Sequence, residues 1–251
     1  MLLAVDVGNT NLTVGVFAGD RLVRQWRLET DPRRSAAWYA RALAGPARKA
    51  GVVTAAVYGS VVPSLDKTID AAIRKAFAVR PLAVGPRSKL GFALKVRTPS
   101  QVGADRVLNA LALKAIVGAP AIGVDFGTAT TFDCVDAAGD YIGGAILLGP
   151  NSAARALHEF TAKLPLVKVR KPASAIGKDT VSCLEAGLYF GYLGMIREVL
   201  GRTRAEMGGR PAVVATGGLA PLFLSDLPGV RHEPDLTLRG LRIAHRILHH
   251  G

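Results

Sequence analysis

Short apolar runs alternate with longer amphipathic segments along the 251-residue chain. Short apolar runs bounded by turn residues are typical of buried strands, whereas apolar positions recurring every three or four residues are typical of helices. We therefore predict strands at 2–7, 12–17, 22–29, 52–58, 121–125, 129–135, 141–146 and 212–215. We predict helices at 35–50, 64–77, 105–117, 151–161, 179–207 and 238–249.

The order of these segments is similar in the two halves of the chain. Each half begins with three closely spaced strands, and crossover helices follow, which predicts an α/β fold of mixed sheets with helices on their faces. The segment Gly118-Ala119-Pro120 separates the halves. We therefore expect two domains, 1–118 and 119–251. Ser64, which follows Pro63, is a candidate N-cap for the helix at 64–77.

Two segments share one local pattern, MLLAVDVGNT at 1–10 and AIGVDFGTATT at 121–131. In each, an apolar run leads to Asp, one apolar residue, Gly, and a hydroxyl or amide residue. Such a glycine-containing turn lets backbone N–H groups approach a ligand closely, and its carboxylate and hydroxyls suit a metal-bound polyphosphate. One such turn is weak evidence, but two suggest a duplicated domain with a nucleotide clamped between the copies. Asp6 and Asp125 are then expected to face one cleft.

The GADR segment at 103–106 lies at a predicted helix N-terminus. The Asp105 carboxylate could take a proton from a substrate hydroxyl, and the Arg106 guanidinium could bind an anion. The alternative is that Asp105 only interacts favourably with the helix dipole.

Two glycine-containing segments remain open to interpretation. Thr216, Gly217 and Gly218 follow an apolar strand and would allow close approach of a base or a phosphate, or would form a plain strand-to-helix turn. The GGA segment at 143–145 would in the same way serve a ligand or only permit close backbone packing.

Composition indicates a globular protein of the reducing cytoplasm. The chain is 49% apolar and 20% charged, so it can bury a core. It has no apolar run near the roughly 20 residues of a membrane span. Asp6 interrupts the first apolar run with no basic segment before it, so we expect no signal peptide. Cys134 and Cys183 match no metal-binding spacing and are expected to be buried thiols.

The net charge of +13 raises the question of nucleic-acid binding. The basic residues are dispersed, and aromatic residues make up only 6% of the chain, so platforms for stacking bases are scarce. A basic surface that attracts anionic substrates is the simpler interpretation.

Beyond these local patterns, the chain resembles the type III pantothenate kinases, members of the actin/sugar-kinase superfamily. The resemblance is an ordered series of motifs over nearly the whole length, and it implies two ribonuclease-H-like domains with a nucleotide cleft between them. The motifs are DVGNTN at 6–11, VFAGDRLVRQWRLETD at 16–31, SVVPSL at 60–65, TPSQVGADR at 98–106, DFGTATTFD at 125–133, YIGGAI at 141–146, TAKLP at 161–165, IGKDT at 176–180, ATGGLA at 215–220 and PDLTLRGL at 234–241.

The resemblance implies ATP-dependent phosphorylation of pantothenate, the first step toward coenzyme A. It implies Asp105 as the general base, with Gly103 and Arg106 at the substrate and Arg106 holding its carboxylate. It implies nucleotide binding by Asp6, Gly8, Asn9, Thr10, Gly127, Thr128, Thr130, Thr216, Gly217 and Gly218. It further implies Mg²⁺ between the β- and γ-phosphates and a monovalent cation, K⁺ or NH₄⁺, at Asp125.

The resemblance also implies a homodimer in which Thr180 reaches the substrate across the interface. We expect that interface in the second half, where the predicted helix 179–207 carries an apolar stripe. The stripe consists of Val181, Leu184, Leu188, Leu193 and Ile196. The alternative is that this stripe packs only inside its own domain.

Three positions depart from the family pattern. Val96 stands where the family usually has a Tyr that contacts substrate, SAAW at 35–38 stands where Asp-Glu is common, and Leu148 replaces a Pro. The phosphate turns and Asp105-Arg106 are intact, so these departures concern the acceptor more than the reaction. A paralogous kinase for another small hydroxyl compound, or a non-catalytic ATP-binding regulator, are the alternatives.

Overall fold

The computed structural model describes residues 1–250, which form two compact units. The first unit comprises residues 1–116 and 235–250, and the second comprises residues 117–234. The division lies beside the predicted boundary at Gly118. The C-terminal segment, which the sequence prediction assigned to the second domain, packs in the first unit instead.

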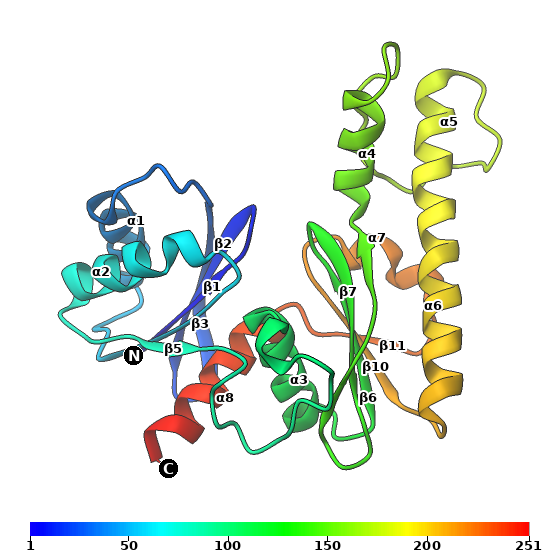
Figure 1. Ribbon diagram of the computed structural model, residues 1–251. Helices are drawn as coiled ribbons and strands as arrows, with labels where there is room; N and C mark the ends of the chain where they lie inside the picture. The colour runs from blue at the N-terminus through cyan, green and yellow to red at the C-terminus, as the bar shows by residue number, and fades with distance from the viewer. Residues whose placement is uncertain (251) are drawn as a thin grey trace. The chain divides into compact units, whose positions relative to one another are not determined.

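The first unit is built on a five-stranded mixed sheet (Figure 1). Its strands, in the spatial order β3-β2-β1-β4-β5, form an antiparallel meander of β1–β3, with β4 and β5 parallel to β1. The strands are β1 (Leu2–Val7), β2 (Asn11–Ala18), β3 (Arg21–Glu29), β4 (Ala55–Ser60) and β5 (Leu82–Val84).

Helices cover both faces of this sheet. They are α1 (Ala36–Arg48) and α2 (Asp66–Phe77) on one face, and α3 (Ala104–Ile116) and α8 (Leu236–His250) on the other. Leu3 and Val5 of β1 pack in the core that contains α1 and α2, whereas Ala4 packs in the core that contains α3 and α8. Because β1 is buried on both faces, it appears in the sequence as a continuous apolar run.

The second unit repeats the strand order of the first. Its sheet runs β11-β10-β6-β7-β8, with β6–β8 antiparallel, β10 and β11 parallel to β6, and β9 paired with β7. Read from the other edge, this is the order of the first sheet, so the predicted duplication of a mixed sheet flanked by helices is confirmed. The strands are β6 (Ala121–Phe126), β7 (Ala129–Val135), β8 (Tyr141–Gly143), β9 (Ile146–Leu148), β10 (Ala212–Thr216) and β11 (Val230–His232).

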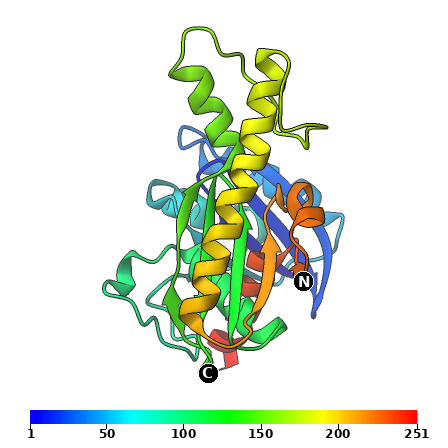
Figure 2. The ribbon, with the colours of Figure 1, turned by 90° about the vertical axis from the view of Figure 1, so that its right-hand side faces the viewer.

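The helices of the second unit include one long helical stretch that lies across the sheet (Figure 2). It consists of α5 (Thr180–Ala186), the π-helical turn η3 (Gly187–Gly191) and α6 (Tyr192–Met207). Ile196 and Leu200 of α6 pack with Ile122 and Val213 of the strands. The other helices are α4 (Pro150–Glu159) and α7 (Ala220–Phe223).

The structure corrects several details of the sequence prediction. The predicted strand 141–146 is two strands, because Gly143 and Gly144 adopt positive φ angles of 106° and 152° that interrupt the pairing. Ser64 is not the N-cap of α2; it lies in the 3₁₀ turn η1 (Pro63–Leu65), and Leu65 occupies the cap position without a side-chain hydrogen bond. Cys134 is buried as expected, but Cys183 is exposed.

Within the part of the chain that the structure describes, no helix combines the length and apolar character needed to cross a membrane.

Candidate active site

The first predicted phosphate turn joins β1 to β2 in the first unit. Gly8 N–H donates to the carbonyl of Asn11 at 3.1 Å, and a Cβ at Gly8 would lie 2.9 Å from that same oxygen. Asn9 and Thr10 are exposed, and Asp6, at the end of β1, is half-buried. The turn is thus tight enough to require glycine, and it presents its polar residues outward.

Thr30 fixes this turn from the end of β3. Its hydroxyl donates to the carbonyl of Gly8 at 2.6 Å, and its N–H donates to the carbonyl of Thr10 at 3.0 Å. The sequence interpretation gave Thr30 no role. The available signal was its place in the RLETD segment of the second motif, but a contact over 22 residues has no local pattern.

The second predicted turn joins β6 to β7 and supports the start of α4. Gly127 N–H donates to the carbonyl of Ala129 at 3.2 Å. The carbonyl of Thr128 accepts hydrogen bonds from Gly149 N–H at 3.0 Å and from the Ser152 hydroxyl at 2.8 Å. A Cβ at Gly149 would lie 2.3 Å from that carbonyl oxygen, so helix α4 can approach this closely only with glycine there.

Thr216 and Gly217 lie beside Asp125. Thr216 pairs with Asp125 in the parallel register of β10 and β6. Gly217 has φ +88°, and a Cβ there would lie 2.5 Å from the Asp125 Oδ1 atom and 2.6 Å from the N atom of Phe126. Asp125 is half-buried and Gly218 is exposed. The structure therefore brings together Asp125, the second turn and the TGG segment. This proximity is needed if, as the sequence analysis expects, all three bind the same nucleotide.

Thr130 and Thr216 are the buried residues of this set, with exposed fractions of 0% and 3%. Thr130 is the first inward-facing residue of β7, and its hydroxyl forms a hydrogen bond with the hydroxyl of Tyr192. Burial is the main cause that raises the pKa of Tyr192 to about 12; the hydrogen bond with Thr130 opposes this rise, and the charge of Asp125 adds to it. The Tyr192 hydroxyl is therefore protonated at neutral pH.

The candidate base Asp105 lies in the first turn of α3. Its Oδ1 atom accepts a hydrogen bond from Arg106 N–H at 2.8 Å. Burial raises the pKa of this carboxyl group, while hydrogen bonding and the charge of Arg106 oppose the rise. A Cβ at Gly103 would lie 2.4 Å from Oδ1, so the residue before the helix has to be small. A raised pKa makes the carboxylate a stronger base at neutral pH.

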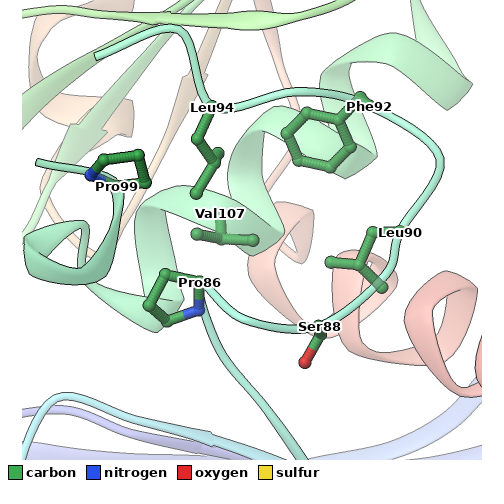
Figure 3. A pocket seen from close by; sticks show the side chains of 7 residues that line it. All are labelled: Pro86, Ser88, Leu90, Phe92, Leu94, Pro99 and Val107. Carbon is green, nitrogen blue, oxygen red and sulfur yellow. The ribbon is translucent and has the colours of Figure 1, made fainter. Parts of the chain in front are cut away.

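Val96 lies in the loop between β5 and α3, where it is half-buried. This loop folds over α3 and borders a cavity of about 200 Å³ that is open to solvent (Figure 3). The cavity is lined by Pro86, Ser88, Leu90, Phe92, Leu94, Pro99 and Val107. Leu90, Phe92 and Leu94 of this loop pack in the same core as Val107, which attaches the loop that carries Val96 to the helix that carries Asp105.

Thr180 is exposed at the first position of α5. Asp179 caps the helix, accepting a hydrogen bond from Ser182 N–H at 2.9 Å, and hydrogen bonds with Ser182 lower the pKa of Asp179. A Cβ at Gly177 would lie 2.3 Å from the N atom of Cys183. The IGKDT segment is therefore packed closely on the start of the helix and presents Thr180 at the surface.

Potential cation ligands are sparse at these turns. Among the side chains of residues 1–249, no three His, Cys, Asp or Glu lie close enough together to hold a metal ion. A cation at Asp125 would therefore need backbone carbonyl, hydroxyl or phosphate oxygens as its other ligands, which are the ligands that hard cations accept.

Comparison with known proteins identifies close relatives over nearly the whole chain. The family model for type III pantothenate kinase matches residues 2–202. A type III pantothenate kinase of Moorella thermoacetica is 44% identical over 250 residues, covering 98% of both chains.

Solved structures share the fold at much lower sequence identity. A putative Baf family transcriptional activator from Campylobacter jejuni has a TM-score of 0.64 at 16% identity, covering 99% of this chain and 100% of that one. A putative 2-dehydro-3-deoxygalactonokinase from Sinorhizobium meliloti has a TM-score of 0.62 at 14% identity, covering 99% of both chains.

Proposed function

Because this chain belongs to the type III pantothenate kinase family, we propose that it transfers the γ-phosphoryl group of ATP to the primary hydroxyl of pantothenate. The product is 4′-phosphopantothenate, and the reaction is the first step of coenzyme A biosynthesis. The observation that carries the proposal is the intact set of two glycine turns and a half-buried carboxylate, in a chain 44% identical to a family member.

Asp105 is the general base in this proposal. Its carboxylate accepts the proton of the pantothenate hydroxyl as that oxygen attacks phosphorus. The backbone N–H of Arg106 holds one carboxylate oxygen in place, and Gly103 leaves the space beside it free. The guanidinium of Arg106 binds the pantothenate carboxylate, which places the acceptor hydroxyl near the base.

Both glycine turns bind the polyphosphate of one ATP molecule. The contacts in the first unit come from Asp6, Gly8, Asn9 and Thr10, and those in the second from Gly127, Thr128, Thr216, Gly217 and Gly218. Phosphoryl transfer depends on positioning and charge neutralisation more than on covalent chemistry, so N–H groups and hydroxyls at fixed turns are suited to it. Mg²⁺ bound with ATP would neutralise part of the negative charge of the phosphate groups at these turns.

Asp125 is the candidate ligand for a monovalent cation, K⁺ or NH₄⁺. Its half-buried carboxylate beside Thr216 and Gly217 provides a negative charge next to the phosphate turn. We expect Asp125→Ala to reduce the dependence of the rate on K⁺, measured as the ratio of turnover with and without the ion. An unchanged ratio would remove Asp125 from the cation site.

The active assembly is a homodimer in this proposal, with Thr180 of each protomer reaching the substrate of the other. Its basis in the structure is a set of exposed apolar side chains in the second unit, since large exposed apolar surfaces mark interaction sites. The set includes Ile146, Leu148, Phe160, Leu166, Ile176, Val181, Phe190 and Met195. Within the predicted stripe, Leu188, Leu193 and Ile196 are buried in their own core, and the half-buried Leu184 packs against that core. For these four residues the alternative interpretation holds, and only Val181 is exposed.

Val96 favours one alternative function, phosphorylation of another hydroxyl compound by the same machinery. An aliphatic side chain there supplies no hydrogen bond to the acceptor. A coupled ADP-release assay with ATP, Mg²⁺ and K⁺, across pantothenate and related alcohols, separates these functions. The proposal predicts the highest kcat/KM with pantothenate. A higher kcat/KM with another alcohol would favour the alternative. ADP release that does not depend on any added alcohol would exclude both functions.

We propose that the protein acts in the cytoplasm. Cys134 and Cys183 form no disulfide, which fits a reducing compartment.

A further inference from the structure

We infer that Tyr192 is a positioning residue that holds the second phosphate turn in its binding geometry, through its hydroxyl on Thr130 and its ring on Phe126. This inference rests on the proposed function, because it assumes that the turn binds ATP. Tyr192 is only 2% exposed, so it acts through the turn and not by touching a substrate.

Tyr192 contacts both strands that enter the turn. Phe126 and Thr130 face each other as the last pair of the β6–β7 hairpin, and the turn lies between them. The Tyr192 hydroxyl bonds the Thr130 hydroxyl, and the Tyr192 ring lies 6.5 Å from the Phe126 ring at an interplanar angle of 56°. A single side chain of α6 thus fixes the base of the turn on both sides.

The same ring cluster reaches the TGG segment. Phe223 of α7 stacks on Phe126 with centroids 5.5 Å apart, and its ring lies 5.3 Å from that of Tyr192. The chain between β10 and α7 also bonds the hairpin, since Leu219 N–H donates to the carbonyl of Phe126 at 3.4 Å. Tyr192 therefore contacts elements that lead directly into Gly127 and Gly217.

The π-helical turn η3 precedes Tyr192 and carries a second tyrosine of similar packing. The ring of Tyr189 also stacks on Phe223, at 5.2 Å. Its hydroxyl, however, donates to the Asp226 carboxylate at 2.5 Å, and the carbonyl oxygen of Leu222 lies 3.3 Å from the same hydroxyl. π-Helical turns shift the helical register and often occur at functional sites. Here the π-helical turn ends directly before Tyr192, the residue that bonds Thr130 at the phosphate turn. Tyr189 provides a matched comparison, because its hydroxyl bonds Asp226 and not the phosphate turn.

The two hydroxyls of Tyr192 and Thr130 depend on each other inside the core. Removing one leaves a buried polar atom without its partner, whereas replacing both by apolar groups of similar shape is close to neutral. The comparison of single and double variants therefore distinguishes two cases: a contact between the two hydroxyls that positions the turn, and two hydroxyls that contribute independently to nucleotide binding. If Thr130 bound ATP directly, removing its hydroxyl would weaken binding whether or not Tyr192 kept its own.

The test compares Tyr192→Phe, Thr130→Val, the double variant and the control Tyr189→Phe. Binding of a non-hydrolysable ATP analogue with Mg²⁺ is measured by calorimetry, and KM for ATP and for pantothenate by turnover. We expect each single variant at the contact to weaken nucleotide binding by about two- to tenfold, the range of one hydrogen bond. KM for pantothenate should stay unchanged, and the double variant should bind no more weakly than either single variant.

Tyr189→Phe should lower the unfolding temperature with little change in nucleotide affinity. Three results for the affinity of the ATP analogue would each overturn the inference: an equal loss in Tyr189→Phe, no loss in Tyr192→Phe, or additive losses in the double variant. A wild-type protein that binds no nucleotide would overturn it as well. If Tyr192→Phe does not fold, Thr130→Val tests the same contact from the strand. A wild-type protein that binds the analogue but does not phosphorylate pantothenate contradicts the proposed function alone, because the affinities still test Tyr192.

Discussion

At the residue scale, the reactivity of Asp105 depends on the partial burial of its carboxylate, which raises its pKa. If Asp105 is the general base, Asp105→Asn keeps the shape of the side chain but removes the basic group. We expect turnover to fall by roughly 10²-fold or more, the usual scale for loss of a general base. Affinity for the ATP analogue should remain at the wild-type value. Turnover near the wild-type rate would remove Asp105 from the mechanism.

The partial burial that makes Asp105 a stronger base also makes its ionised carboxylate unfavourable for the stability of the fold. Because the pKa of this carboxyl is raised in the folded state, its contribution to stability is complete below the unfolded pKa and is lost as pH rises through the folded pKa. At neutral pH the ionised group therefore destabilises the fold. Asp105→Asn should melt at a higher temperature than wild type at pH 7, with the difference shrinking in acid. A lower melting temperature at pH 7 would contradict the proposed electrostatic cost.

Val96 provides a test of the acceptor. A hydrogen bond to a charged group contributes about 1.5–3 kcal/mol, or roughly 10- to 150-fold in affinity. We expect Val96→Tyr to lower KM for pantothenate by about tenfold or more. Val96→Phe is the matched control, since it adds the ring without the hydroxyl. Loss of activity with Val96→Tyr, or an equal effect of both variants, would show that no hydrogen bond was missing.

Some site residues were accessible from sequence and others were not. Asp6, Asp125 and Asp105 each belong to a short motif in which neighbouring residues supply the context. Thr30 and Tyr192 contact residues 22 and 62 positions away, respectively, so their roles depend on tertiary structure. Periodicity places Tyr192 inside a helix, but only the structure shows its partner.

At the scale of elements, the turn after β10 depends on a glycine that cannot be replaced. Gly217→Ala would force a Cβ against Asp125 at a positive φ. We expect it to destabilise the protein by at least about 1 kcal/mol and to weaken nucleotide binding. Gly201→Ala in α6, where nothing lies within 4 Å, should stabilise by about 0.5–1 kcal/mol without changing binding. Urea unfolding gives the stability of both variants, and calorimetry gives their nucleotide affinity. A Gly217→Ala variant with wild-type stability and affinity would contradict the requirement for glycine at this turn.

The long elements were predicted well because their patterns are strong. Strands β1 and β7 have their predicted bounds, and α1, α3 and α8 differ from prediction by a few residues. Strands β5 and β11, each three residues long, were missed because so short a run has no measurable period. The packing of α8 on α3 was also missed, since apolar periodicity shows that a helix is buried but not against which domain.

At the scale of the whole molecule, assembly is tested by the exposed aromatic residue after α4. Phe160 is 86% exposed, and a dimer that buries two copies gains about 1.5–3 kcal/mol from each. We expect Phe160→Glu to raise the dimer dissociation constant by roughly 10²-fold or more, measured by light scattering over a dilution series. If Thr180 completes the site of the other protomer, as proposed, the monomer should lose activity.

The matched control for assembly is Val52→Glu. Val52 is 80% exposed but belongs to the first unit, so its replacement should leave the dimer intact. A wild-type protein that is monomeric at micromolar concentration and fully active would exclude a shared active site.

Phosphoryl transfer from ATP to pantothenate with Asp105 as the base can be tested on the reaction product itself. The most direct measurement is mass spectrometry of the product after incubating wild-type protein or Asp105→Asn with pantothenate, ATP, Mg²⁺ and K⁺. We expect wild type to form phosphopantothenate in step with ADP, and the Asn variant to form it roughly 10²-fold more slowly. ADP release without phosphopantothenate would contradict pantothenate as the acceptor, and equal product from both proteins would contradict Asp105 as the base.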